Sequence, residues 1–305
     1  MKTLKSLVQK QWLIAGILFH ALLIALLLVA ANGMYSTVKH GVYGHKGAKV
    51  YYDAVHCARH LWNRDNRRYR SDYHSISGFF RFFRAMEQAG FKPHAETYGC
   101  FNRSILNQYD VYFVGEQTYQ GRFMTAEEQA ALMEWVADGG GLFVIAEHTN
   151  AHYMDEIVNE LLKHLPVKAR FDAINEASSA DPSWLALKDV KEHPITEGIH
   201  EYHFYNGCSL DTPHGVLFSS RASWSDKYDP KDAPVNNGNK KKDPDEISGP
   251  LAGAAAFTHG KGRVVVIGDH NAFSNLELNF ADHHRFILNS LKWLAGDRVN
   301  RDFLF

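Results

Sequence analysis

The chain has 305 residues, the length of one or two domains of ordinary size. Hydrophobic residues make up 45% and charged residues 22%, which excludes a wholly disordered, collagen-like or disulfide-scaffold protein. The net charge of -1 gives the chain no bulk electrostatic reason to bind nucleic acid. The 18 histidines are the unusual feature, because histidine is the commonest metal ligand and titrates near neutral pH.

The first 32 residues have the pattern of a membrane anchor. Lysines precede an apolar run over residues 12–31, and twenty helical residues span about 30 Å, one hydrocarbon core. Positive charge before the run predicts a cytoplasmic N-terminus, a single-pass transmembrane signal anchor and an extracytoplasmic remainder, either periplasmic or extracellular. A cleaved signal peptide is the alternative, since residues 29–31 end the run with small side chains.

Beyond a linker over residues 33–47, predicted strands and helices alternate. Apolar or alternating runs predict strands over residues 48–55, 94–98, 110–115, 142–146, 216–219, 253–258 and 263–268. Helical spacing predicts helices over residues 76–90, 125–138, 152–165 and 281–294. Continuous apolar strands separated by helices predict a doubly wound α/β domain with a mainly parallel sheet. The domain spans residues 48–296, with an irregular segment at 166–214, a polar mobile loop at 225–248 and a tail at 297–305.

Three predicted strands are followed by the same chemistry, a carboxylate with a histidine one or three residues later. The pairs are Asp53 with His56, Glu147 with His148, and Asp269 with His270. Because ligands bind beyond the carboxyl ends of strands in open α/β sheets, we expect the three pairs to meet along one edge. Asn150 and Asn271 follow two of the pairs and are expected to orient substrate or water.

Carboxylates and imidazoles support two kinds of chemistry. They can ligate a divalent cation such as zinc, manganese or iron, or they can act as acid and base on a substrate. We assign Asp53, His56, His148 and His270 as metal ligands, and Glu147, Asp269, Asn150 and Asn271 as catalytic residues. A metal held there would make hydroxide near neutral pH, which points to a hydrolase.

Each of these residues also has a plain structural interpretation. A histidine after a strand often only caps a loop, and His283 and His284 are expected on the surface of the last helix. The three cysteines, Cys57, Cys100 and Cys208, are expected as buried small apolar residues. The motifs GxSxG, GxCxG, GxGxxG and the Walker loop are absent, so no nucleotide cofactor is expected.

Four stretches of the chain together resemble the class I glutamine-amidotransferase-like superfamily. They are YDVYFVGEQ, FMTAEEQAALMEWVADGGGLFVIAEH, HPITEGI and GKGRVVVIGDHNAFSN, and the resemblance extends over residues 49–296. More narrowly, the chain is similar to an uncharacterised membrane-anchored branch related to gliding-type ABC transporter auxiliary proteins and trehalose-utilisation-like proteins. The resemblance implies a flavodoxin-like fold. It does not imply glutamine hydrolysis, because Glu147 and His148 follow the central strand where that activity needs a cysteine.

Two functions follow from these patterns. The first is a membrane-anchored extracytoplasmic hydrolase, metal-dependent, that acts on an envelope glycan or peptide. The alternative is a non-catalytic module that binds a sugar or a partner protein in an envelope transport or assembly complex. Metal content distinguishes the two, since only the first requires a bound cation.

Overall fold

A computed structural model describes residues 16, 18–24, 47–53, 55–56, 78–96, 100–115, 123–177, 180–227 and 238–296. By its internal contacts the chain divides into two units, residues 1–44 and 45–305. Within the described ranges, no helix is both long and apolar enough to cross a bilayer. Most of the predicted anchor over residues 12–31, most of the linker and the predicted tail lie outside the described residues.

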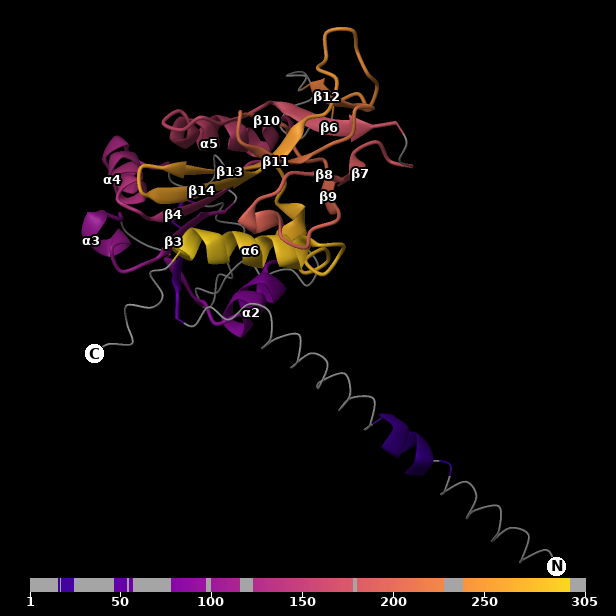
Figure 1. The fold of residues 1–305 in the computed structure, drawn as a ribbon, viewed down its shortest axis with the longest axis horizontal. Helices are drawn as coiled ribbons and strands as arrows, with labels where there is room; N and C mark the ends of the chain where they lie inside the picture. Colours follow the sequence, from indigo (N-terminus) through magenta and orange to yellow (C-terminus); the bar gives the residue numbers. More distant parts are fainter. Residues whose placement is uncertain are drawn as a thin grey trace, which may run out of the picture. The chain divides into compact units, whose positions relative to one another are not determined.

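Strands and helices alternate through the first half of the second unit, and short strands dominate the second half (Figure 1). The strands are β1 (Lys49–Asp53), β2 (Lys92–Glu96), β3 (Val111–Val114), β4 (Gly141–Ile145), β5 (Lys168–Ala169), β6 (Asp172–Glu176), β7 (Trp184–Leu187), β8 (Asp189–Val190), β9 (Tyr202–Tyr205), β10 (Leu210–Asp211), β11 (Gly215–Phe218), β12 (Ser223–Lys227), β13 (Ala252–His259) and β14 (Gly262–Ile267). The α-helices are α2 (Phe80–Gln88), α3 (Arg103–Leu106), α4 (Ala126–Ala137), α5 (Met154–Leu162) and α6 (His283–Ala295), with 3₁₀ helices η3 (His148–Tyr153), η4 (Pro194–Thr196) and η6 (Asn271–Phe273).

The central sheet has ten strands and two halves of different character. Its main path runs β2-β1-β3-β4-β14-β13-β10-β5, with β11 beside β13 and β8 beside β11. The first five strands are parallel, whereas β13 and the strands beyond it pair antiparallel. The expected α/β class with a large, mostly parallel sheet is confirmed. The antiparallel half arises because a two-residue turn at Gly260, with φ of 60°, returns β13 directly into β14.

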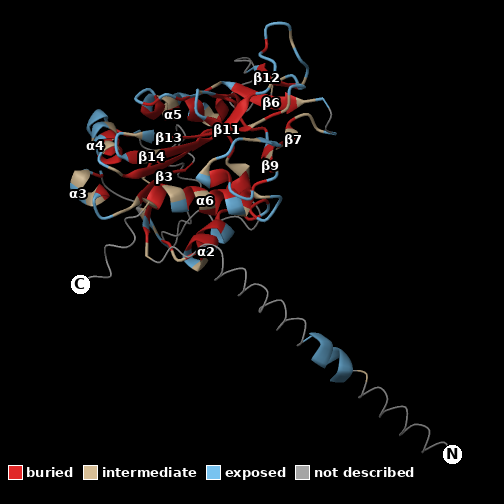
Figure 2. Ribbon diagram, viewed as in Figure 1, coloured by how far each residue is buried: buried red, intermediate tan, exposed pale blue. Residues whose placement is uncertain are grey.

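Helices cover both faces of the parallel half, as Figures 1 and 2 show. Every residue of β3 and β4 is buried, which explains why these strands are continuous apolar runs rather than alternating ones. Tyr112 and Val114 join the core under α4 and α5. Phe113, on the opposite face, packs on Phe82 of α2 and on Phe273. The sheet therefore separates two apolar cores and leaves only its strand ends for chemistry.

Local signals predicted some helix boundaries and missed others. Thr125 and Glu128 form the expected capping box at the start of α4. The predicted helix at residue 152 starts instead at Met154, because four residues of the preceding turn have left-handed backbone. The helix predicted over residues 76–90 begins only at Phe80, and Phe80, one of the apolar residues whose helical spacing indicated it, is 49% exposed.

The predicted polar loop over residues 225–248 is wrong at its start. Residues 225–227 belong to β12, which pairs antiparallel with β6, and their polar side chains made the strand look like loop. Residues 228–237 lie outside the described part of the chain. From residue 238 onward the backbone is held by side chains of the strand, since Asp226 accepts N–H groups of Asn239 and Lys240.

Candidate functional site

The candidate site lies where β4 and β14 end side by side. These parallel strands are paired up to Ile145 and Ile267, and the Ala146 N–H donates to the Ile267 carbonyl. The acidic residues two positions beyond each strand are thereby brought to the same edge of the sheet. Ligand atoms of Glu147, Asp269 and His270 all lie within 4.8 Å of one another. Two of the three predicted acid–histidine pairs therefore meet.

Glu147 is the buried centre of this group. Its Oε2 accepts a hydrogen bond from His270 Nδ1, and its Oε1 accepts the backbone N–H of His148 at 3.0 Å. The His148 ring also lies near, with Nε2 3.5 Å from the same Oε1. The carboxylate side chain is 2% exposed, compared with 23% for His270 and 11% for His148. The imidazoles thus form the solvent side of the site and the carboxylates form its floor.

Asp269 is the second buried carboxylate, and backbone amides hold it in place. Its Oδ2 accepts the Tyr205 N–H and its Oδ1 accepts the Asn271 N–H, both at 2.7 Å. Burial and the nearby Glu277 charge raise the pKa of Asp269 and the two amide bonds lower it, with a net pKa of about 7. A carboxyl group that titrates near neutral pH can exchange a proton with a bound molecule.

The turn after Glu147 has strained backbone. Thr149, Asn150, His152 and Tyr153 have φ values of 44°, 54°, 52° and 62°, in the left-handed region where residues other than glycine cost about 1–3 kcal/mol each. The buried Asp155 holds the turn, since its two oxygens accept the N–H groups of Glu147 and Asn150 at 3.0 Å. Strain of this kind concentrates at functional sites, so the turn supports a functional role for Glu147 and His148.

The two predicted asparagines are both placed at this edge, in different surroundings. The Asn150 amide is engaged with the first turn of α5, because it donates to the Glu156 carboxylate at 2.9 Å and accepts the Glu156 N–H at 3.0 Å. Asn271 donates from Nδ2 to the Tyr205 carbonyl at 3.0 Å. Asn271 therefore ties β9 to the site, and Asn150 ties Glu147's turn to α5.

The third predicted pair lies elsewhere. His56 donates from Nδ1 to Asp53 at 2.8 Å, and its Nε2 is 3.5 Å from Glu128 Oε2 of the α4 capping box. Both Asp53 and His56 are almost completely buried, at 0% and 1% exposed. Strand β3 separates β1 from β4, so the structure leaves this pair outside the group around Glu147.

Several residues near the site were missed or misplaced by sequence reasoning. His283 is fully buried, although it was expected on the helix surface. In the interior its Nδ1–H donates to the Glu277 carbonyl and its Nε2 accepts the His203 N–H. Burial lowers the pKa of His283 to about 4, which keeps the ring neutral as these bonds require. Glu277 and Tyr205 reach the site through tertiary contacts, which no local pattern signals.

The cysteines fit the expected structural role only in part. Cys208 is buried beside the site's strands, as expected, and its thiol is free. Cys100 is exposed, so its predicted burial is wrong. Cys57 lies outside the described residues.

Fold and site together define a mixed α/β protein with an acid–histidine group at a sheet edge. A family model described as a domain of unknown function, DUF4350, matches residues 78–291, and the chain belongs to that family. No curated protein matches the chain.

Solved structures of similar fold share little sequence with this chain. The mmIFT52 N-terminal domain is 15% identical with a TM-score of 0.59, and the match covers 81% of this chain and 98% of that one. A cytoplasmic protein from Salmonella typhimurium LT2 is 14% identical with a TM-score of 0.47, covering 81% and 99%. A ThuA-like protein from Bacteroides uniformis is 13% identical with a TM-score of 0.42, covering 84% and 93%. Likeness at this level concerns the fold alone.

Proposed function

We propose that this chain is a hydrolase whose site is formed by Glu147, His148, Asp269 and His270. The observation that carries the proposal is the convergence of two carboxylates and an imidazole within 4.8 Å at the end of two neighbouring strands. The partly exposed His270 gives a bound molecule access to that group. We further propose a divalent cation, zinc, manganese or iron, as its cofactor, because mixed oxygen and nitrogen ligands suit these metals.

The chain's own residues have distinct tasks in this proposal. Glu147 fixes the orientation of the His270 ring through Nδ1. Asp269, held by two amide bonds beside His270, gives or takes a proton. A cation bound between these groups would supply a water molecule of lowered pKa. Asn271 positions Asp269, and Asp53 and His56 lie outside the proposed ligand set.

The same proposal includes a flavodoxin-like fold and an extracytoplasmic, membrane-anchored location. The five parallel strands follow the order 2-1-3-4-5 of flavodoxin-like sheets, which supports a class I amidotransferase-like arrangement. We propose a single-pass anchor near residues 12–31 and an extracytoplasmic domain, so the substrate would be an envelope glycan or peptide. Glutamine hydrolysis is not proposed. That activity needs a cysteine after the central strand, and here Glu147 and His148 follow β4.

Elemental analysis of the full chain tests this proposal. The protein is purified in detergent without a histidine tag, exposed to zinc or manganese, dialysed and measured. We expect about one bound cation per chain, and its loss in His270→Ala, because a ligand is removed. His164→Ala is the matched control, since His164 is an exposed histidine on the surface after α5.

Equal metal content in wild type and His270→Ala, or no metal in either, would contradict the metal site. A hydrolase screen on the same samples then separates the remaining choices. Activity without metal would leave Glu147, His270 and Asp269 as an acid–base group. Binding without turnover would favour the alternative of a non-catalytic module that binds a sugar or an envelope partner.

A further inference from the structure

The small sheet of β7 and β9 has one face turned away from the core. Its register pairs Trp184 with Tyr205 and Ala186 with His203, and alternate residues of a strand point to opposite faces. The intervening pair, Leu185 and Phe204, is buried, whereas Trp184, Ala186, His203 and Tyr205 are at least partly exposed. Two aromatic rings and an imidazole therefore share one open face.

The rings on this face form a continuous surface together with Phe280. The Trp184 ring centroid lies 5.4 Å from that of Tyr205 and 5.6 Å from that of Phe280, and His203 lies 4.8 Å from Phe280. Tyr205 and Phe280 are 37% and 42% exposed. The rings meet at interplanar angles of 56°, 63° and 74°, so they form an uneven aromatic surface. We call Trp184, His203, Tyr205 and Phe280 the aromatic platform.

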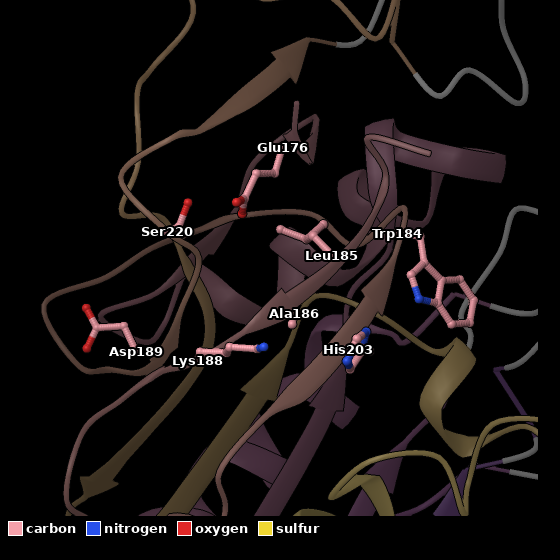
Figure 3. Close-up of a pocket in the computed structure, with 8 residues that line it drawn as sticks. All are labelled: Glu176, Trp184, Leu185, Ala186, Lys188, Asp189, His203 and Ser220. Atoms are coloured by element: carbon pink, nitrogen blue, oxygen red, sulfur yellow. The ribbon is translucent and has the colours of Figure 1, made fainter. Parts of the chain in front are cut away.

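A cavity of about 620 Å³ adjoins the platform at Trp184 and His203. Figure 3 shows Ser220 and Asp189 on one side of it, Trp184 on the other, and Glu176 above. The volume lies in the range of small-molecule sites, and a few polar groups among apolar walls are typical of them. Among the residues that line the cavity, Lys188 carries the positive charge, and it is paired with Glu201 at 3.1 Å. The lining is therefore acidic in balance.

Strand β9 connects this cavity to the candidate site. His203 lines the cavity, and two residues later Tyr205 donates its N–H to Asp269 and accepts Asn271 Nδ2–H at its carbonyl. The platform and the candidate site therefore share a strand, and the backbone of Tyr205 links the two.

We propose that the cavity and the aromatic platform bind a neutral carbohydrate and serve as the substrate subsite of the proposed hydrolase, a role that rests on the proposed function. Aromatic faces stack on the C–H faces of sugar rings, and carboxylates and hydroxyls such as Glu176, Asp189 and Ser220 accept and donate to sugar hydroxyls. The acidic lining disfavours phosphate-bearing ligands. A short peptide is the competing occupant, and the test includes it.

Calorimetric titration of the full chain tests the proposal, in a detergent without a sugar headgroup. The probes are chitotriose, cellotriose and maltotriose, with trialanine as the peptide. We expect at least one trisaccharide to bind, and Trp184→Ala to weaken it by about tenfold or more because a stacking ring is lost. Trp184→Phe should restore part of the affinity, and Phe280→Ala, at a more exposed ring, should weaken it independently of folding.

Phe171→Ala is the matched control, since Phe171 is a partly exposed aromatic residue lining a different cavity. Binding of trialanine alone, of no trisaccharide, or of a trisaccharide equally by wild type, Trp184→Ala and Phe280→Ala overturns the proposal. The metal content and turnover of wild type separate it from the proposed function. Trisaccharide binding to a wild-type protein that holds no metal and hydrolyses none of the probes would support the carbohydrate site while the hydrolase fails.

Discussion

Two regions of the molecule have the same sequence pattern and different surroundings. After β1, the pair Asp53 and His56 is sealed in the interior, at 0% and 1% exposed. After β14, Asp269 is equally buried, but the neighbouring His270 side chain is 23% exposed and contacts Glu147 from another strand. His56 is therefore sealed from solvent, whereas the His270 side chain is accessible to a bound molecule.

The difference comes from what lies next to each strand end. Strand β14 neighbours β4, so two acid–histidine pairs meet, whereas β3 separates β1 from β4. The first turn of α4 also places Glu128 within 3.5 Å of His56 Nε2, which gives that imidazole a second carboxylate. The two pairs that meet lie at neighbouring strand ends, whereas Asp53 and His56 pack against the first turn of α4.

Replacement of His56 is expected to have the largest effect on stability. His56→Ala would remove the imidazole that donates to the buried Asp53, and breaking a buried carboxylate–imidazole pair costs about 3–5 kcal/mol. The free energy of unfolding, measured by urea denaturation, should fall by that amount. The exposed control His164→Ala should change it by about 0.5 kcal/mol or less.

A loss below about 1 kcal/mol in His56→Ala would contradict the structural role of this pair. Loss of bound metal in His56→Ala would show that all three acid–histidine pairs act together, as the sequence alone suggested. Both readouts come from one sample, so stability and metal content can be compared directly.

Features of the fold that a short segment determines could be predicted from the sequence, whereas features that depend on contacts between distant segments could not. The apolar runs that became β4 and β14, and the capping box of Thr125 and Glu128, were readable because a short segment determines each. The meeting of Glu147 with His270 followed from the general rule for strand ends. Strand order was not readable, because it depends on pairing between distant segments, and so Asp53 and His56 were grouped with the wrong neighbours.

The left-handed turn after Glu147 was unpredictable for a different reason. Glycine usually marks such backbone, and this turn contains none, because Asp155 and Glu156 hold it through side-chain bonds. His283 was misplaced because its partners, Glu277 and His203, come from distant parts of the chain. Tertiary contacts that override local preference are thus concentrated around the candidate site.

Asp226 is a third buried carboxylate held by amide groups. Its contribution to the free energy of unfolding is expected to depend on pH. It accepts bonds from the backbone of Asn239 and Lys240 and from Asn175, yet burial raises its pKa from 3.8 to about 6. The folded state therefore binds the proton more tightly than the unfolded state, and this stabilisation is lost as pH rises through about 6. Between about pH 4 and about pH 7 the stability of wild type relative to Asp226→Asn should fall by about 2 kcal/mol.

Urea denaturation at several pH values measures this slope. Asp226→Asn also loses acceptors, but that loss shifts its stability by a constant amount and leaves the slope difference intact. Asp245→Asn is the control, because Asp245 is an exposed carboxylate on the same segment. Parallel pH profiles for wild type and Asp226→Asn would show that amide bonds compensate the buried charge completely.

The smallest effect is expected at the candidate site itself. His270→Ala removes a partner of the buried Glu147, but the partly exposed position of His270 admits water in its place, and His148 N–H still donates to Glu147 Oε1. The free energy of unfolding of the metal-free protein should fall by less than about 1 kcal/mol, well below the loss in His56→Ala. Equal losses in the two variants would mean that both pairs are structural. A small loss of stability together with loss of bound metal or activity would instead assign the Glu147–His270 edge to function, because residues that serve a ligand need not stabilise the fold.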